Sequence, residues 1–523
     1  MAKRIITLSS LKIAVLGAGT MGSGIALAVL LADMPVTLYD VSEAMLGRAR
    51  EYIHKHLRRK GKESNLAELR LTTDLQELHG SDVLIEAVPE ELSLKQELFA
   101  RLDSICPPPA ILATNTSTLS VTLIAAGTSS PARVGGMHFF NPAPVLPLVE
   151  VVRGAGTSPE VVKTLVTLAE KIGKTPVVTS DTPGFIVNRV ARPFYGEALR
   201  LLGEGSATHQ QIDQIVRLGA GFRMGPFELM DLIGIDINLA AMQSMYEQTF
   251  GEPRYRPHPI QVRMVQQKAL GRKTGHGFYR YDQETQPGEV QPPGIARSTG
   301  FVNLSPGSWA PGLVQLLKQA GYRLVNGSLT QASNPILAIV PASRSEGLQR
   351  QLFELDQTLP PDVPLLCQAA DVCLMEAATW LSHPERLVGF DGLFFSRGHV
   401  ACLVPSPTLT PQARMKVEGF VSSLGRLPVW LEDSPALVLP RLIAMLANEA
   451  AFAVQEGVAE PDTIDLAMQL GVNYPKGPLA WANEIGYQNV IEILDHLRAE
   501  YGEDRYRASP LLRRWARLQM VNA

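Results

Sequence analysis

The chain has 523 residues, of which 46% are hydrophobic and 19% charged, so it is too long for one domain and too apolar for a disordered protein. Its 48 basic and 51 acidic residues leave a net charge of -3, which supplies no global field for nucleic acid or an anionic membrane. We therefore expect several folded domains in which any anion-binding site is local.

The cysteines and the N-terminus carry no sign of a metal site or of export. Four cysteines are scattered along the chain, and Cys367 and Cys373, six residues apart, have no histidine pair beside them. The richest apolar stretch near the start, Ile25–Leu31, is far shorter than the roughly 20 residues of a membrane span. We expect a cytoplasmic protein without a metal that binds neither membranes nor nucleic acid.

Short apolar runs bounded by turn residues alternate with helical patterns from the N-terminus to about Ser180, which is typical of parallel strands joined by crossover helices. The expected strands are residues 12–16, 36–39, 83–87, 111–113, 134–138, 148–152 and 176–179. The first five of them predict a doubly wound α/β sheet.

The first strand leads directly into a glycine-rich turn, Gly17-Ala18-Gly19-Thr20-Met21-Gly22, and then into an apolar helix at 23–31. The G-x-G-x-x-G spacing is weak evidence alone, but a preceding strand and a following helix are the setting in which it binds a dinucleotide. Gly17 permits the tight turn, Gly19 lets the backbone approach a pyrophosphate, and Gly22 allows close helix packing. A glycine turn without a ligand is the alternative.

The second strand delivers Asp40, which follows the glycine turn at the spacing of about 20 residues that is typical of dinucleotide-binding sites. An acidic residue at this place accepts hydrogen bonds from the adenosine ribose hydroxyls, and its charge repels a 2'-phosphate. The pattern therefore predicts NAD rather than NADP as the cofactor.

After residue 184 the pattern changes to long helical segments, which predicts a second, all-α domain. Residues 456–478 repeat residues 204–226 at an offset of 252 (456 minus 204), and Arg254-Tyr255-Arg256 returns as Arg505-Tyr506-Arg507. The stretch between the two copies resembles a worn sheet domain, since Pro384-Glu385-Arg386 stands where Pro131-Ala132-Arg133 stands; chance similarity between two α/β segments is the alternative.

Four segments beyond the glycine turn resemble the 3-hydroxyacyl-CoA dehydrogenase family, and the resemblance covers residues 12–281. The segments are Asn115-Thr116-Ser117, MHFFNP at 137–142, Leu148-Val149-Glu150 and DTPGFIVNR at 181–189. NRVARP at 188–193 and GVNYPKGPLAW at 471–481 are similar to the longer bacterial 3-hydroxybutyryl- and 3-hydroxyadipyl-CoA dehydrogenases of phenylacetate degradation.

The resemblance implies NAD-dependent oxidation of the 3-hydroxyl of a (3S)-3-hydroxyacyl-CoA, with the 3-hydroxyadipyl or 3-hydroxybutyryl thioester as the expected substrate, to a 3-oxoacyl-CoA. Alcohol oxidation needs a base for the hydroxyl proton, and His138 at the end of its strand offers an imidazole. Glu150 on the next strand would hold the other ring nitrogen, and Ser117 and Asn188 match the family's positions that bind the substrate oxygens. Each residue also has a structural alternative. His138 would be a core histidine and Glu150 an edge-strand charge. Ser117 would be a helix cap and Asn188 a surface helix residue.

The same matching assigns Glu90, Lys95, Asn115 and Lys273 to the cofactor, although both lysines would equally fit as solvated charges. A basic tract after Asp40 lies in the helix that borders CoA in the family, so Arg58 and Arg59 are candidate substrate contacts. The chain lacks the family's insertion after this helix and has His56 where a serine is common, which puts individual contacts in doubt. Arg192 or Arg223 would meet a distal carboxylate, or would be a surface arginine.

The second half cannot use the same chemistry. In the repeat, Pro440 aligns with Asn188, and the residues that align approximately with His138 and Ser117 are Asp391 and Ala370. Short family members dimerise through their helical domains. We therefore expect the second helical copy to pack on the first as a pseudo-dimer within one chain, with a homo-oligomer also open.

The resulting fold class is a Rossmann-type NAD-binding domain plus an all-α domain, followed by a degenerate Rossmann-like segment and a second helical copy. The expected boundaries are 1–183, 184–285, a linker at 286–311, 312–433 and 434–523. Two other functions stay open: an NAD dehydrogenase of a free hydroxy acid, which would use a lysine, and a non-catalytic structural protein that binds NAD or acyl-CoA.

Overall fold

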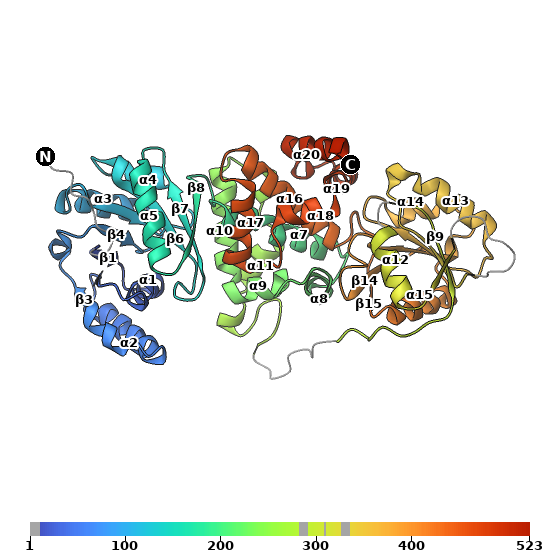
Figure 1. The fold of residues 1–523 in the computed structure, drawn as a ribbon, viewed down its shortest axis with the longest axis horizontal. Helices are drawn as coiled ribbons and strands as arrows, with labels where there is room; N and C mark the ends of the chain where they lie inside the picture. The colour runs from blue at the N-terminus through green and yellow to red at the C-terminus, as the bar shows by residue number, and fades with distance from the viewer. Residues whose placement is uncertain (1–10, 282–290, 308–309, 326–334, 523) are drawn as a thin grey trace. The chain divides into compact units, whose positions relative to one another are not determined.

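The computed structural model describes residues 11–281, 291–307, 310–325 and 335–522 (Figure 1). Two compact units emerge: unit 1 contains Met1–Val190 and Ala453–Asn473, and unit 2 contains Ala191–Phe452 and Tyr474–Ala523. Each unit takes segments from both halves of the chain, so the expected contiguous boundaries do not describe how the segments pack. Within the described ranges, no helix is long and apolar enough to cross a bilayer.

Unit 1 is built on an eight-stranded sheet in the order β3-β2-β1-β4-β5-β6-β7-β8. All neighbours are parallel except β6 and β7, which run antiparallel. The strands are β1 Ile13–Leu16, β2 Val36–Tyr39, β3 Leu69–Thr72, β4 Val83–Glu86, β5 Ile111–Thr114, β6 Val134–Phe139, β7 Leu148–Arg153 and β8 Thr175–Ser180. The doubly wound sheet is confirmed, and only β3 was missed, because three of its four residues are at least partly exposed.

Helices cover both faces of this sheet, and the carboxyl ends of the mutually parallel strands β1–β6 lie at one edge. The helices of unit 1 are α1 Thr20–Leu31, α2 Glu43–Arg59, α3 Leu92–Ile105, α4 Val121–Ala125, α5 Pro159–Lys171, α6 Val187–Val190 and α17 Pro461–Val472. Helices α1, α2 and α5 share one buried core, whereas α3 and α4 contribute to the other. Ligands of open α/β sheets bind at the edge where the strands end, and the glycine turn lies there.

Unit 2 contains a second sheet, in the order β10-β9-β11-β12-β13-β14-β15. Its strands are β9 Phe301–Leu304, β10 Arg323–Val325, β11 Leu337–Val340, β12 Leu365–Gln368, β13 Leu387–Phe390, β14 Val400–Pro405 and β15 Leu427–Trp430. The order reproduces that of unit 1 without a partner for β3 among the described residues, and β13 and β14 form the same antiparallel pair. The degenerate copy is therefore confirmed.

The predicted linker at 286–311 is wrong over part of its length. β9 lies inside it and pairs with β10 and β11, so the second sheet begins before residue 312. The strand was missed because F-V-N-L is short and stands among Pro, Gly and Ser residues. Residues 282–290 lie outside the described part of the chain.

The helices of the two copies also lie in corresponding places. The first copy has α7 Arg192–Gly203, α8 His209–Ala220, α9 Pro226–Ile233, α10 Ile235–Gln248 and α11 Pro259–Gln266, and the second has α16 Leu439–Gln455, α17, α18 Pro478–Ile485, α19 Tyr487–Tyr501 and α20 Pro510–Asn522. Reciprocal buried bonds join the copies within unit 2. The Tyr255 hydroxyl donates to Glu449 at 2.6 Å, and the Tyr506 hydroxyl donates to Glu197 at 3.1 Å.

One helix is exchanged between the copies. α17, from the second copy, packs against β7, β8 and α6 in unit 1, while α8, from the first copy, packs against β14 in unit 2. The Ser180 amide donates to the Val458 carbonyl at 3.0 Å, and the Glu432 amide donates to the Ser206 carbonyl at 3.2 Å. The repeat offset of 252 relates the two donors (432 minus 180) and the two acceptors (458 minus 206). Each sheet is thus covered by a helix of the other copy.

Gly471 on α17 tests this packing. A Cβ atom there would lie 2.8 Å from Leu148 Cδ2 and 3.0 Å from Val187 Cγ2. We expect Gly471→Ala to lower the free energy of unfolding by about 1–3 kcal/mol through overpacking. Urea denaturation measures the change.

Gly419→Ala is the matched control. Gly419 lies on α15 (Pro411–Ser423), where a Cβ atom would meet nothing within 4 Å. Alanine is the better helix former, so the free energy of unfolding of this variant should rise by about 0.5–1 kcal/mol. A Gly471→Ala protein as stable as the control would show that α17 does not pack tightly on β7 and α6.

Candidate active site

His138 and Glu150 face each other on the antiparallel pair β6 and β7. Nδ1 of His138 lies 2.7 Å from Oε2 of Glu150. The histidine is 5% exposed and the glutamate 0%. The alternative reading of Glu150 as an edge-strand charge is therefore wrong, since β7 is an interior strand and the carboxyl is buried against a single imidazole.

The second oxygen of Glu150 accepts hydrogen bonds from the backbone amides of Ile186 and Val187, both at 3.0 Å. Gly184 and Phe185 adopt left-handed backbone conformations with φ of 76° and 50°, which turn these amides toward the carboxyl. Sequence reasoning missed this support, although the T-P-G-F turn before α6 was its visible signal.

This arrangement fixes the imidazole. A carboxylate only accepts hydrogen bonds, so Nδ1 carries the hydrogen and Nε2 keeps its lone pair. The rings of Phe140 and Phe185 lie 4.5 Å and 5.9 Å from the imidazole, centroid to centroid. The pair can therefore take a proton at Nε2 and stabilise the resulting cation through Glu150.

Ser117 and Asn188 meet next to this pair. Asn188 follows Val187, and its Nδ2 donates to the Ser117 carbonyl at 3.2 Å. The Ser117 hydroxyl lies 3.3 Å from Oε1 of Glu90. Both residues are half-buried. The structure thus links five of the predicted residues, from His138 through Glu150, Asn188 and Ser117 to Glu90, through one continuous chain of contacts in unit 1.

Glu90 organises the loop that carries Ser117. Its Oε1 accepts from the Thr116 hydroxyl at 2.6 Å and from the Ser117 and Thr118 amides at 2.9 and 3.1 Å. Burial alone would raise the pKa of the Glu90 carboxyl, but the Lys95 charge and these donors lower it below its usual value.

Lys95 is buried between two carboxylates. Its Nζ lies 2.6 Å from Glu86 and 3.2 Å from Glu90. The alternative of a solvated helix charge is wrong, because the side chain is 1% exposed. This geometry makes Lys95 a residue that positions Glu90. Asn115 likewise fixes the backbone, since its Oδ1 accepts from the Phe139 amide at 2.8 Å.

The glycine turn lies between β1 and α1, as expected. Gly17 has φ of 101°, and a Cβ atom on it would lie 2.6 Å from the Ala87 carbonyl oxygen. A Cβ atom on Gly19 would meet nothing within 4 Å, and no side chain caps the first turn of α1. An open backbone at the positive end of a helix fits the phosphates of a dinucleotide.

Asp40 lies beside this turn. Its Oδ2 accepts from the Ala18 amide at 2.7 Å and its Oδ1 from the Ser42 amide at 2.9 Å. The carboxylate is therefore fixed at the end of β2, where a ribose would lie. Contacts of Ala18, Thr20, Met21 and Asp40 with the cofactor stay predictions.

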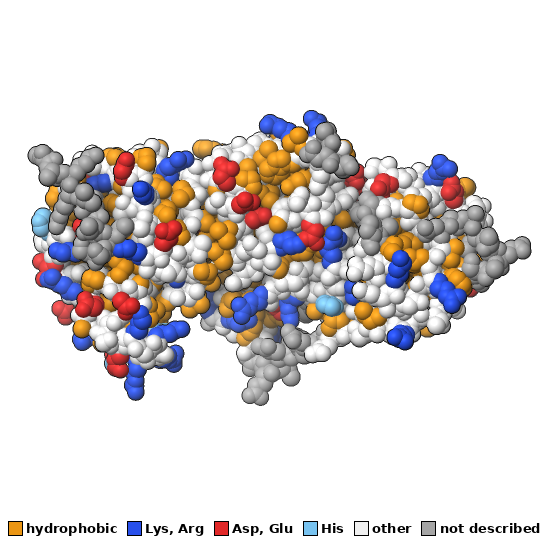
Figure 2. Space-filling model, viewed as in Figure 1, with side chains coloured by type: hydrophobic (Ala, Val, Ile, Leu, Met, Phe, Trp, Pro, Cys, Tyr) orange, Lys and Arg blue, Asp and Glu red, His pale blue; other side chains and the backbone are white. Residues whose placement is uncertain are grey.

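Lys and Arg side chains gather over α2 (Figure 2). A hollow of about 600 Å³ there is lined by Glu51, His54, Lys55, Arg58 and Arg59. Arg58 and Arg59 are exposed, whereas His56 bonds the Tyr52 carbonyl through Nδ1 at 2.8 Å. The two arginines are therefore accessible to an anion, and their contact with CoA stays a prediction.

Three further predicted residues belong to unit 2. Lys273 pairs with Asp236 at 2.5 Å. Arg192 is only 4% exposed on α7 and lies over the Tyr195 ring, so the alternative of a surface arginine is wrong for it, whereas Arg223 is exposed. Their roles at the cofactor or at a distal carboxylate stay predictions.

Comparison with known proteins shows what the chain is similar to. The family model described as "3-hydroxyacyl-CoA dehydrogenase, NAD binding domain" matches residues 12–182, and that of the C-terminal domain matches residues 184–281 and 437–522. A protein of Escherichia coli K12 named 3-hydroxyadipyl-CoA dehydrogenase is 38% identical over 516 residues, 97% of this chain and 98% of its own.

Shorter and solved relatives agree with this match. A probable 3-hydroxybutyryl-CoA dehydrogenase of Bacillus subtilis is 43% identical over 283 residues, covering 52% of this chain and 98% of its own length. The crystal structure of 3-hydroxybutyryl-CoA dehydrogenase from Escherichia coli K12 superposes with a TM-score of 0.83 at 36% identity, over 99% of this chain and 100% of that chain.

The corresponding place in the second sheet has lost the pair. The β13–β14 register pairs Phe390 with Leu403, so the next residues, Asp391 and Cys402, stand where His138 and Glu150 stand in unit 1. Asp391 is 2% exposed, and its Oδ1 accepts from the Leu393 and Phe394 amides, both at 3.1 Å. Burial raises the pKa of the Asp391 carboxyl to about 7.

This buried carboxyl should make stability depend on pH. The pKa of Asp391 is about 7 in the folded chain and 3.8 ordinarily. The stability that the protonated carboxyl contributes is therefore fully present below about pH 4 and is lost as the pH rises through 7. In the wild type we expect the free energy of unfolding to fall by a few kcal/mol between about pH 4 and pH 7. Asp391→Asn stays neutral across this range, so the variant should lack this decline. Urea unfolding across this range checks the expectation, and an unchanged slope in the variant would contradict it.

Proposed function

Because the chain belongs to the 3-hydroxyacyl-CoA dehydrogenase family, we propose that it oxidises the 3-hydroxyl of a (3S)-3-hydroxyacyl-CoA to a 3-oxoacyl-CoA with NAD. The observation that carries the proposal is the buried His138–Glu150 pair, with Glu150 held by the Ile186 and Val187 amides. The glycine turn and Asp40 support NAD as the cofactor.

Each residue has a definite task in this reaction. Nε2 of His138 takes the hydroxyl proton, and Glu150 stabilises the imidazolium that forms. The glycine turn and Asp40 would hold NAD, which would supply the acceptor for the hydride that leaves C3 of the substrate. Ser117 and Asn188 hold the substrate oxygens and polarise the ketone in the reverse direction. Both must first exchange their present contacts with Glu90 and with each other.

We propose 3-hydroxyadipyl-CoA as the preferred substrate, with 3-hydroxybutyryl-CoA as the second candidate. One relative that matches nearly the whole chain is named for the adipyl thioester. The Bacillus relative, matched over half the chain, and the solved Escherichia coli structure, matched over 99% of it, are named for the butyryl thioester. Arg58 and Arg59 are the proposed contacts of the CoA phosphates.

Two alternatives are disfavoured by the same residues. A dehydrogenase of a free hydroxy acid would use a lysine base, but Lys95, the buried lysine beside the Ser117 loop, is paired with Glu86 and Glu90. A structural protein that binds NAD or acyl-CoA needs neither the oriented imidazole nor the amides that hold Glu150.

His138→Gln tests the reaction. The variant loses its general base, so we expect kcat to fall by about 10²–10⁴-fold, with KM for NAD little changed. Initial rates of NADH formation with 3-hydroxybutyryl-, 3-hydroxyhexanoyl- and 3-hydroxyadipyl-CoA measure it and rank the substrates. His383→Gln is the control, because His383 belongs to unit 2, where it pairs with Glu385 at 3.2 Å.

Retention of activity in His138→Gln would favour the free-acid alternative. If the unmodified chain reduced NAD with none of the three thioesters, the structural alternative would stand instead. A rate with the butyryl thioester equal to or above that with the adipyl thioester would overturn only the substrate preference.

We propose further that the second helical copy takes the place of a partner subunit. The reciprocal bonds of Tyr255 with Glu449 and of Tyr506 with Glu197 support this pseudo-dimer. Arg441 adds ion pairs to Glu197 and Glu204, both at 2.9 Å. The four free cysteines support a reducing, cytoplasmic compartment.

Removal of residues 290–523 tests the pseudo-dimer. The shortened chain loses α17 and exposes the apolar surface of β7, β8 and α6 that this helix covers. We expect it to self-associate or aggregate and to lose most of its activity. Size-exclusion chromatography with light scattering and the NADH assay measure both effects. A monomeric, soluble and fully active fragment would remove the basis of the proposal.

A further inference from the structure

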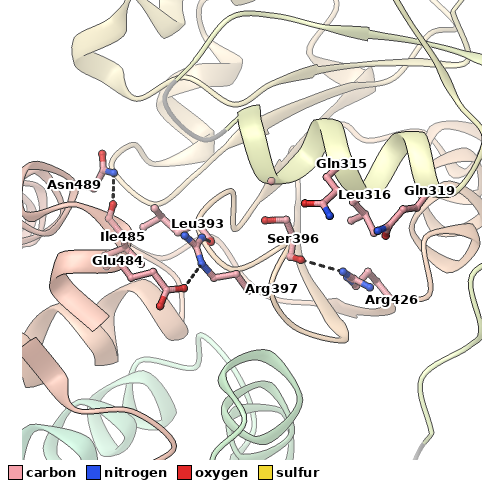
Figure 3. A pocket seen from close by; sticks show the side chains of 11 residues that line it. Gln315, Leu316, Gln319, Leu393, Ser396, Arg397, Arg426, Glu484, Ile485 and Asn489 are labelled. Carbon is pink, nitrogen blue, oxygen red and sulfur yellow. Dashed lines mark hydrogen bonds and ion pairs between the residues drawn. The ribbon is translucent and has the colours of Figure 1, made fainter. Parts of the chain in front are cut away.

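Two clusters of side chains join the second sheet to the second helical copy within unit 2. The first surrounds a hollow of about 510 Å³ beside α12 (Ala310–Gln319), where Arg397 from the sheet side points to Glu484 on α18 (Figure 3). Arg397 Nε lies 3.1 Å from Glu484 Oε1, so this cluster is an ion pair that is already complete.

The second cluster contains Cys373, His496 and Glu500. Cys373 immediately precedes α14 (Leu374–Ala378), and its Sγ lies 3.9 Å from Nε2 of His496 on α19. His496 is 7% exposed. Glu500 stands one helical turn further along α19, on the same face, and its Oε1 lies 3.9 Å from Nδ1 of His496.

These spacings are close to those of a metal site. One ligand atom from each of the three residues lies within 4.8 Å of the other two. Metal–ligand distances of about 2.0–2.3 Å place neighbouring ligands of a tetrahedral ion roughly 3.3–3.6 Å apart. One ring nitrogen of His496 would bind the ion, and side-chain rotations of Cys373 and Glu500 would bring their ligand atoms to it from within 4.8 Å.

We propose that Cys373, His496 and Glu500 bind a zinc-like divalent ion, with water in the fourth position. A thiolate and an imidazole select such ions over Mg²⁺ and Ca²⁺, which prefer oxygen ligands. The ion pins the start of α14 to α19 and thereby fastens the second sheet to the second helical copy.

The carboxylates around the cluster suit a cation, because Asp433, Glu500 and Glu376 place negative charge near Cys373. Arg344 is the positive charge among them, and its guanidinium is paired with Glu376 at 2.8 Å. A bound divalent ion supplies the positive charge that replaces the thiol proton.

The ligand set is specific to the second half of the chain. At the repeat offsets, Ser120, Ser244 and Gln248 occupy the positions of Cys373, His496 and Glu500 (373 minus 120 is 253; 496 minus 244 and 500 minus 248 are 252). The sequence predicted no metal because the cysteine and the histidine are far apart along the chain (496 minus 373 is 123). The first half also supplies substitutions that this fold tolerates.

Cobalt titration of the full-length, chelator-treated and reduced chain tests the site. Co²⁺ bound to a thiolate shows sulfur-to-metal charge-transfer absorption in the near ultraviolet. We expect this band to saturate at one equivalent of Co²⁺ per chain and to be bleached by one equivalent of Zn²⁺. We also expect Zn²⁺ to raise the melting temperature of the wild-type chain.

Cys373→Ser and His496→Ser should abolish the band and the Zn²⁺-dependent rise in melting temperature, whereas Glu500→Gln should weaken Co²⁺ binding. Cys106→Ser is the matched control, because it also leaves three thiols and alters a buried cysteine of unit 1. It should bind Co²⁺ like the wild type. Absence of the band in the wild type, or its survival in Cys373→Ser, would overturn the proposal. Neither readout depends on NADH formation.

Discussion

The buried carboxylate of Glu150 is the constraint on which the rest of unit 1 depends. It accepts from the His138 ring on one side and from the Ile186 and Val187 amides on the other, so it ties β6, β7 and α6 together. A buried carboxylate is costly unless each oxygen is satisfied, and here three donors satisfy it. The carboxylate therefore fixes the imidazole and the two amides in place. The strained backbone at Phe185 is the cost of orienting these amides toward the carboxylate.

The exchanged helix extends this constraint to the whole chain. α17 packs on α6 and β7, the two elements that support Glu150, although it comes from the far end of the sequence. Unit 2 repeats the arrangement with α8 on β14. An internal duplication with exchanged helices makes the two halves inseparable, since neither sheet can bury its last strands with its own helical copy. The second half then has a structural task even where it has lost the chemistry.

Local patterns predicted what local forces decide. The strand, glycine turn and helix at 13–31 follow from hydrophobic periodicity and from the need for a left-handed Gly17. The His138–Glu150 pair came from a family resemblance, and its support by the Phe185 turn was missed. Lys95 was assigned to the cofactor, with a solvated helix charge as the alternative, and its ion pairs were missed because Glu86 and Glu90 become its neighbours only in the folded chain. The exchange of α8 and α17 leaves no local pattern at all, since it depends on contacts between segments from opposite halves of the chain.

Comparison of the two sheets separates what the fold requires from what the reaction requires. The buried ion pair between Arg133 and Asp103, at 2.6 Å, is repeated in the second sheet domain by Arg386 and Asp356, at 2.7 Å. The left-handed pair before α6 also returns, at Ala436 and Leu437, even though alanine is strained where Gly184 was not. By contrast, Asp391 and Cys402 replace the histidine and the glutamate. The packing contacts were kept at a cost in backbone strain, whereas the catalytic pair was replaced. The chemistry of the described residues therefore supports a single active site, in unit 1.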